Sequence, residues 1–307
     1  KRTTPLYPSG SDSIGLPRTM YGTKQNTIYQ NDNYEGYFFH FYDDGKISAF
    51  GGNDVISQAI TDSSIDISAS NLNPSGSNLQ PIVSAESAST FKSILDGTGT
   101  NTAITSVSQI AVGANSTYLL GTNEKLYVVG DNQSGQLGIN STTDAVVVTT
   151  AKTGGSEMTN VTQIAAGKNF CYALKSDYTI YSTGDNTYGQ LGQGNTTQLT
   201  QFTEISGLTG VSKIACGADH ALILKTDGTI MSCGRNNHGQ LGLGSTTNVS
   251  SFTQIQILGT SGGNITNVID ICCTESNSFI MKGNFDIYST GSSYGGKPST
   301  SYIFTKI

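Results

Sequence analysis

Short apolar stretches alternate with polar turns in an order that recurs several times along the chain. One stretch ends in two small residues and a glycine, as in 164-IAAG-167 and 214-IACG-217. An alternating stretch such as 221-ALILK-225 follows, and after a polar turn comes a further stretch, 229-TIMSCG-234. Stretches of this length between turn-forming residues are typical of β-strands, and no stretch has the length and spacing of a long helix.

A glycine-rich turn follows each of the clearest units: 130-GDNQSGQLGIN-140, 184-GDNTYGQLGQG-194 and 234-GRNNHGQLGLG-244. The copies are 54 and 50 residues apart, counted from their first glycines. A loop that cradles a nucleotide phosphate is needed only once. Three copies therefore indicate an architectural repeat.

Four β elements in each unit predict an all-β fold, a β-propeller of four-stranded blades. We place a short strand such as 202–205 first in each unit and the glycine last. Units that end at Gly51, Gly130, Gly184, Gly234 and Gly291 give five blades, and residues 6–15 indicate a sixth, so we expect six or seven.

We expect residues 1–307 to form a single propeller domain that is part of a longer chain. Residues 54–100 are rich in Ser, Ala, Asn and Thr and interrupt the period, so we interpret them as a surface insertion within one blade. The segment 302–307 looks like a first strand, and 4–10 looks like a last one. These two terminal strands would share a blade and close the ring.

The turn residues are expected to be structural. Glycine supplies the positive φ of a tight turn, the leucine inserts between adjacent blades, and the glutamine satisfies backbone groups at the junction. The predicted structural positions are Gly130, Gly135, Gln136, Leu137, Gly138, Gly184, Gly189, Gln190, Leu191, Gly192, Gly234, Gly239, Gln240, Leu241 and Gly242.

The turns and the small-small-glycine strand together resemble the repeat of the regulator of chromosome condensation family. The best single match is 214-IACGADHALIL-224, in which we expect His220 to be a structural blade residue. The family's histidine is replaced by Phe170 in one copy and, in our alignment, by Thr117 in another. The resemblance implies a propeller, usually of seven blades. It also implies the family's founding activity, guanine-nucleotide exchange on the small GTPase Ran.

Composition narrows the classes of partner. The net charge is −6, and the 16 basic residues are scattered, which argues against a nucleic-acid surface. No apolar run reaches membrane-spanning length, so we expect no membrane insertion. The five cysteines are an odd number and two are adjacent, which favours a reducing, intracellular compartment, the cytoplasm or cytoskeleton.

No motif nominates a catalytic group, a metal or a cofactor, and we expect none. The segment 291-GSSYGGKP-298 begins like a nucleotide-binding loop, but Pro298 stands where the hydroxyl residue that holds magnesium is required. Cys272 and Cys273 lack the spacing of a metal or redox pair. They align with 165-AA-166, so we interpret them as core residues.

We therefore predict a non-catalytic protein–protein interaction platform, a subunit or domain of a larger assembly of the cytoskeletal or ciliary kind. Its candidate contacts are the variable turn residues Tyr188, Arg235, Asn237 and His238, together with the insertion, and the other interpretation is that these are solvated turn tips. Two other functions remain open. One is a guanine-nucleotide exchange factor for a small GTPase, and the other is a secreted or surface binding protein.

Overall fold

The computed structural model describes residues 37–41, 47–51, 60–61, 92–94, 107–256, 265–292 and 301–307. Within these ranges all the regular secondary-structure elements are β-strands, and they form five four-stranded antiparallel sheets and one two-stranded hairpin. The predicted all-β class with four-stranded blades is confirmed. The sheets are called blades 1 to 5 in chain order.

Blade 1 has the strand order β1-β2-β4-β3, and the other four blades follow the chain order. Blade 1 contains β1 (Tyr37–Phe41), β2 (Ile47–Gly51), β3 (Ile60–Thr61) and β4 (Lys92–Ile94). Blade 2 contains β5 (Val107–Val112), β6 (Ser116–Gly121), β7 (Leu126–Gly130) and β8 (Ala145–Thr150). The hairpin consists of β9 (Lys152–Thr153) and β10 (Ser156–Glu157).

The three C-terminal blades repeat the plan of blade 2. Blade 3 contains β11 (Val161–Ala166), β12 (Phe170–Lys175), β13 (Ile180–Gly184) and β14 (Leu199–Glu204). Blade 4 contains β15 (Val211–Cys216), β16 (His220–Lys225), β17 (Ile230–Gly234) and β18 (Val249–Gln254). Blade 5 contains β19 (Val268–Thr274), β20 (Asn277–Lys282), β21 (Ile287–Gly291) and β22 (Ser301–Lys306).

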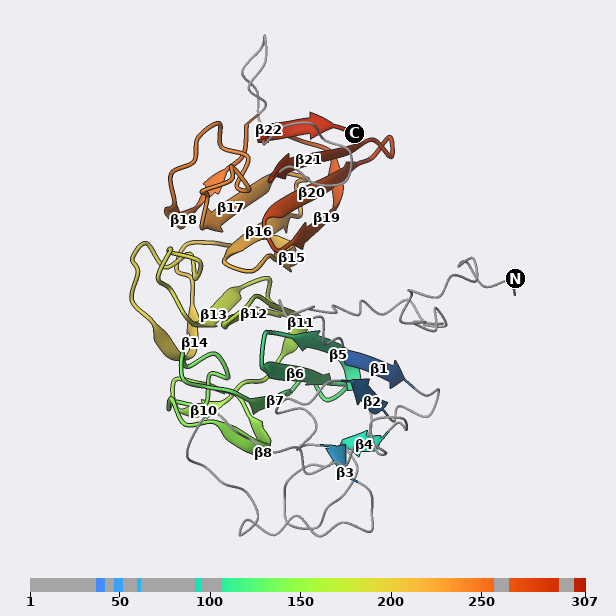
Figure 1. Cartoon of the computed structure of the whole chain (residues 1–307), viewed down its shortest axis with the longest axis vertical. Helices are drawn as coiled ribbons and strands as arrows, with labels where there is room; N and C mark the ends of the chain where they lie inside the picture. Colours follow the sequence, from blue (N-terminus) through green and yellow to red (C-terminus); the bar gives the residue numbers. More distant parts are fainter. Residues whose placement is uncertain are drawn as a thin grey trace, which may run out of the picture.

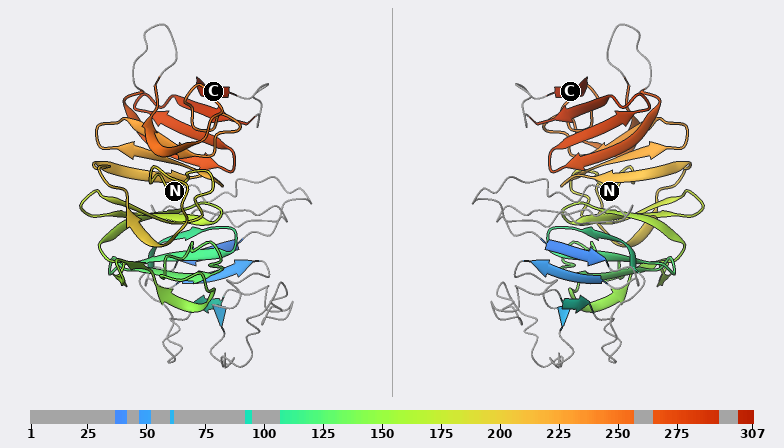
Figure 2. Two further views of the ribbon diagram at one scale, coloured as in Figure 1. Left: turned by 90° about the vertical axis from the view of Figure 1, so that its left-hand side faces the viewer. Right: turned by 90° about the vertical axis from the view of Figure 1, so that its right-hand side faces the viewer.

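Blades 2 to 5 follow one another along the long axis of the molecule (Figures 1 and 2). Their first strands β5, β11, β15 and β19 contact one another in succession, so each blade packs on the next near its inner edge. This is the arrangement of consecutive propeller blades. A count of six or seven blades stays a prediction.

The boundary of each blade differs from our expectation. The strand that contains Phe202 was placed first in a unit, but β14 pairs with β13 through Ser182 and Thr203 and closes blade 3. The long turn after Gly184 folds back and carries the chain antiparallel to the strand it has just left. Blades 3 and 4 therefore begin with the small-small-glycine strand.

The expectation that 302–307 forms the first strand of a blade was wrong, because here too the strand after the long turn closes its own blade. Strand β22 pairs with β21 through Ser289 and Thr305, so it is the fourth strand of blade 5 and not the opening strand of a shared blade. Segment 4–10 lies outside the described residues. The 54–100 insertion also lies largely outside them, although β3 and β4 fall within it and pair with each other, and β4 pairs with β2.

The hydrophobic core consists of the junctions between blades. Leu137 of blade 2 is buried with Cys171 and Phe202 of blade 3 in one cluster. Leu191 of blade 3 is buried with Cys233 of blade 4 in the next cluster, and a further cluster joins blades 4 and 5. Alternate residues of each strand face opposite junctions, which is why the strands are apolar on both faces.

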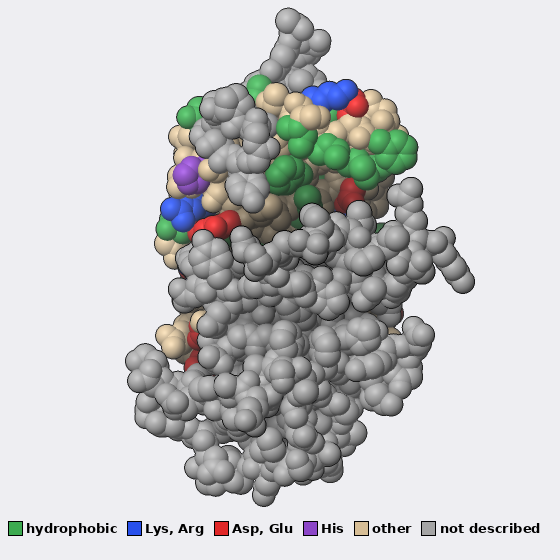
Figure 3. Space-filling model, turned by 45° about the vertical axis from the view of Figure 1, so that its right-hand side comes forward, with side chains coloured by type: hydrophobic (Ala, Val, Ile, Leu, Met, Phe, Trp, Pro, Cys, Tyr) green, Lys and Arg blue, Asp and Glu red, His purple; other side chains and the backbone are tan. Residues whose placement is uncertain are grey.

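Blade 5 exposes residues that are buried in the other blades. Ile287 is 42% exposed, whereas Ile180 and Ile230 at the same register are fully buried. Hydrophobic side chains gather on the surface of the C-terminal part (Figure 3). Cys272 has the register of Ala165 but is exposed, so our interpretation of it as a core residue was wrong: the alignment holds, but no described strand covers this face.

Candidate docking face

The loops after the first and third strands of each blade emerge at the same end, because the strands are antiparallel. We call this end of blades 2 to 5 the turn face. Backbone hydrogen bonds join its inner loops in series: Ala114 N to Lys168 O (2.9 Å), Lys168 N to Ala218 O (2.8 Å) and Ala218 N to Glu275 O (3.1 Å). The turn face is therefore one continuous, hydrogen-bonded surface.

A fully buried asparagine organises the long turns of blades 2, 3 and 4. Asn186 Nδ2 donates to the carbonyl oxygens of Asn195 and Thr197, both at 3.0 Å, and its Oδ1 accepts from Leu191 N at 2.9 Å. Asn132 and Asn236 make the same three contacts in their own turns. Our list of structural residues omitted these asparagines, although the third position of all three turn copies is Asn.

The glutamine that follows reaches back across the same turn. Gln190 Oε1 accepts from Tyr188 N at 2.8 Å, and its Nε2 donates to Asp185 at 2.9 Å. The backbone carbonyl oxygen of Gln190 accepts from Tyr172 Oη at 2.7 Å. Gln136 and Gln240 also accept from the backbone two residues before them.

The leucine and glycines of the turns lie at the blade junctions. Leu137, Leu191 and Leu241 are fully buried. Gly192 has a φ of 70°, and an added Cβ would lie 2.7 Å from the ring of Phe252 in the next blade. The other predicted glycines also have positive φ: Gly130, Gly135, Gly138, Gly184, Gly189, Gly234, Gly239 and Gly242.

Two of the four candidate partner contacts touch each other. The guanidinium carbon of Arg235 lies 4.8 Å from the ring centroid of Tyr188, which belongs to the preceding blade. Arg235 also forms an ion pair of 3.0 Å with Asp219. Asn237 is exposed and His238 is half-buried on the same turn as Arg235. The four residues thus form one patch across the junction of blades 3 and 4.

The described turn face carries more carboxylates than basic groups. Lys168 and Arg235 are its cations. Burial, together with the nearby Asp144, raises the pKa of Asp131 above its usual range. The carboxylates of the face are Asp131, Asp144, Asp185, Asp219 and Glu275.

His220 is a junction residue and not a surface base. It is fully buried, its Nε2 lies 2.9 Å from Ser278 Oγ, and burial lowers its pKa to about 3. One detail of our alignment was wrong: Ser116 pairs with Gly130 as His220 pairs with Gly234, so the counterpart of His220 in blade 2 is Ser116 and not Thr117. Ser116 donates to Tyr118 Oη at 3.2 Å.

Across the described ranges, no group of three or more His, Cys, Asp or Glu residues is placed to hold a metal ion. The same part of the chain contains no helix that is long and apolar enough to cross a membrane. All five cysteines are free thiols.

Comparison with known sequences identifies the repeat. A profile of the regulator of chromosome condensation (RCC1) repeat matches residues 123–174, 179–224 and 227–281, and a second profile of this repeat matches 161–190 and 211–240. The chain belongs to the regulator of chromosome condensation repeat family. The resemblance inferred from the turn and strand motifs is therefore confirmed.

Characterised relatives match over short stretches. The X-linked retinitis pigmentosa GTPase regulator of Homo sapiens is 37% identical over 84 residues, which is 27% of this chain and 8% of that protein. The protein RCC2 homolog of Danio rerio is 37% identical over 79 residues, 26% of this chain and 16% of the relative. The matched stretch is thus a small fraction of each relative's length.

Solved structures match over most of the chain. Human WBSCR16 has a TM-score of 0.64 at 18% identity, covering 92% of this chain and 67% of the other. Prp20p from Saccharomyces cerevisiae, studied with its binding to Gsp1p and histones, has a TM-score of 0.61 at 19% identity, covering 88% and 61%. These likenesses show that the chain has the fold of this propeller family.

Proposed function

We propose that this chain is a non-catalytic platform that binds a partner protein on its turn face. The observation that carries the proposal is the contact of Arg235 with Tyr188 across the junction of blades 3 and 4. Arginine and tyrosine are enriched among the few residues that carry most of the binding energy of protein interfaces. Both side chains are held in place here, so docking would cost little additional side-chain entropy.

The chemistry of the face supports a partner with an apolar or aromatic anchor surrounded by basic groups. The excess of carboxylates would attract such a partner and slow the approach of acidic ones. We further propose that the chain works inside the cell, in the cytoplasm or cytoskeleton, as part of a larger assembly. Free cysteines support a reducing compartment.

The test begins with affinity purification of the full-length protein from its native source and identification of the proteins recovered. Binding of the recovered partner is then measured for Tyr188→Ala and Arg235→Ala. Tyr178→Ala is the matched control, because Tyr178 is 55% exposed at the opposite end of blade 3. We expect each turn-face variant to weaken binding about tenfold and the control to leave it unchanged. Equal binding by all variants would refute the turn face as the docking site.

Nucleotide exchange on a small GTPase is the alternative function. It is favoured by the name of the relative described as a GTPase regulator and by the reported binding of Prp20p to Gsp1p. The discriminating measurement is the release of labelled nucleotide from the recovered GTPase. Acceleration of release by the purified chain would replace the non-catalytic platform with an exchange factor.

A further inference from the structure

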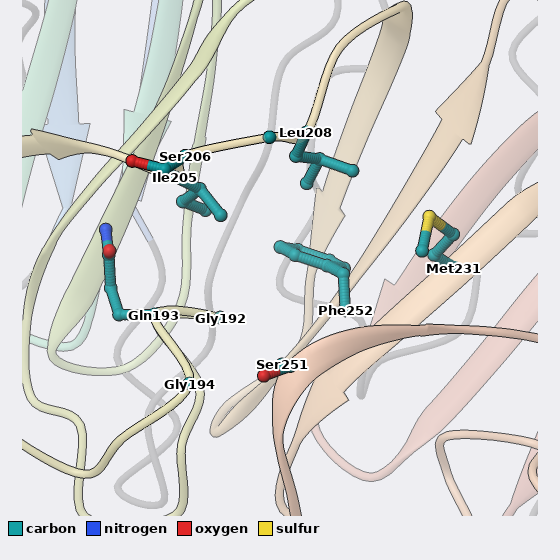
Figure 4. A pocket seen from close by; sticks show the side chains of 10 residues that line it. Gly192, Gln193, Gly194, Ile205, Ser206, Leu208, Met231, Ser251 and Phe252 are labelled. Atoms are coloured by element: carbon teal, nitrogen blue, oxygen red, sulfur yellow. The ribbon is translucent and has the colours of Figure 1, made fainter.

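A pocket of about 380 Å³ opens at the outer edge of the junction between blades 3 and 4 (Figure 4). Its walls come from the end of the blade 3 turn, Gly192–Gly194, from the connection 205–208, and from Met231, Ser251 and Phe252 of blade 4. No charged side chain lines it. Its volume suits a few residues of a peptide and not a folded domain.

At the preceding junction, between blades 2 and 3, a hairpin occupies the position that corresponds to the pocket. In blade 2, Ala151 donates to Leu126 O, just as Ile205 donates to Ile180 O in blade 3. After Ala151 the chain forms the β9–β10 hairpin and returns at Met158, whose amide donates to Ala151 O. In blade 3 the corresponding return is at Leu208, whose amide donates to Ile205 O. Blade 3 thus has only Ser206 and Gly207 where blade 2 has a whole hairpin.

The hairpin lies on the counterparts of the pocket walls. Lys152 N donates to Gly138 O at 2.8 Å, and Gly155 N donates to Gln201 Oε1 at 3.2 Å. Strand β9 contacts β14. Gly138 corresponds to Gly192, because Gly138 lies against the ring of Phe202 as Gly192 lies against the ring of Phe252. Gln201 corresponds to Ser251, because Gln201 forms a β-bridge with Ile139 as Ser251 does with Gln193.

Because blade 3 lacks this hairpin, side chains and a backbone carbonyl of blades 3 and 4 remain accessible at the pocket. Phe202 is 1% exposed at the junction of blades 2 and 3, where the hairpin is present, whereas Phe252 is only half-buried at the pocket. Met231 is also half-buried. The carbonyl oxygen of Gly192 receives no backbone hydrogen bond of the kind that Gly138 receives, within the described residues.

We propose that this pocket binds a short, uncharged extended segment of a partner protein in place of the missing hairpin. A backbone N–H of that segment donates to Gly192 O, and an aliphatic or thioether side chain packs on Phe252 and Met231. Recognition would thus combine one backbone hydrogen bond with one side-chain anchor. The pocket is not lined by Tyr188, Arg235, Asn237 or His238, so the proposal goes beyond the platform function and does not depend on it.

Met231 offers a direct reporter. The full chain, labelled with ¹³C at its four methionine methyl groups, would be titrated with a synthetic peptide that copies residues 150–159, with glutamine in place of both Lys152 and Glu157 so that its side chains are uncharged. Met158 is the internal control, because it is fully buried at the junction that the hairpin already occupies. We expect the Met231 signal to shift in a saturable way and the Met158 signal to stay in place.

Two changes test the contacts. Ser206 is exposed in a connection, so Ser206→Trp fills the pocket without disturbing the core and should abolish the shift. Thr187→Trp, on an exposed residue of the turn face, should leave it intact. Methylation of the peptide nitrogen that copies Lys152 should weaken binding about fivefold, the effect of one hydrogen bond. The proposal fails if Met231 does not shift, if Ser206→Trp leaves the shift unchanged, or if a scrambled peptide shifts it equally. None of these readouts measures partner binding through Tyr188 or Arg235, so failure here leaves the platform proposal standing.

Discussion

The hydroxyl of Ser278 in blade 5 donates a 2.7 Å hydrogen bond to the carbonyl oxygen of Gln240 in blade 4. In blades 2 and 3 the same carbonyl accepts from a tyrosine of its own blade, Tyr118 or Tyr172. Blade 4 has a leucine at that register, and the next blade supplies the hydroxyl instead. Because the Ser278 proton points to Gln240, the contact with His220 requires the proton of the imidazole to be on Nε2.

Removal of this hydroxyl should destabilise the junction of blades 4 and 5. Ser278→Ala leaves both the Gln240 carbonyl and His220 Nε2–H buried without a partner, so we expect a loss of about 2–4 kcal/mol in the free energy of unfolding. Ser212→Ala is the matched control, because Ser212 also donates to a carbonyl but is exposed. Urea unfolding followed by circular dichroism measures both. A similar, small loss in the two variants would contradict the role of Ser278.

The stability of the fold should depend on His220 in mild acid. Burial lowers its folded pKa to about 3 from an ordinary value of 6.5, so the unfolded chain binds the extra proton between these pH values. The contribution of neutral His220 is complete above pH 6.5 and is lost as the pH falls toward 3. His220→Phe places in blade 4 the residue that blade 3 has as Phe170.

We expect the free energy of unfolding of wild type to fall by about 2 kcal/mol more than that of His220→Phe between pH 7.5 and pH 5. Carboxylates titrate in both proteins, so the comparison isolates the histidine. Urea titrations at the two pH values give the difference. Parallel pH dependence of the two proteins would show that His220 is not held neutral by burial.

The buried asparagines should be more important to the turns than their small size suggests. Asn186→Ala leaves two carbonyls and the Leu191 amide without partners, and we expect a loss of about 3 kcal/mol. Asn115→Ala, at an exposed loop position, should change stability by less than about 0.5 kcal/mol. Hydrogen exchange should show the protection of the Leu191 amide falling in the first variant only. Unchanged protection would mean that the turn forms without the asparagine.

The repeated order of strands and turns could be predicted because each copy repeats the same local chemistry. The first and last strands of each blade could not be predicted, since a unit that begins with the strand of Phe202 and one that begins with the strand of Ile164 contain the same strands in cyclic order. Only the pairing of Ser182 with Thr203 decides between them, and a long turn separates those residues. The contact of Arg235 with Tyr188 depends in turn on the packing of whole blades.

Alanine substitutions at two glycines that line the pocket, Gly192 and Gly207, should distinguish the cost of backbone strain from the cost of steric overlap. Gly192 and Gly207 have nearly equal φ, 70° and 76°, so alanine at either position incurs a similar backbone cost of about 1 kcal/mol. An added Cβ at Gly207 meets nothing within 4 Å, whereas at Gly192 it would lie 2.7 Å from the Phe252 ring. We therefore expect Gly192→Ala to lower the free energy of unfolding by about 2 kcal/mol more than Gly207→Ala, the cost of an overpacked site. Equal losses in urea unfolding would show that Phe252 moves away freely and that the blade junction is not closely packed there.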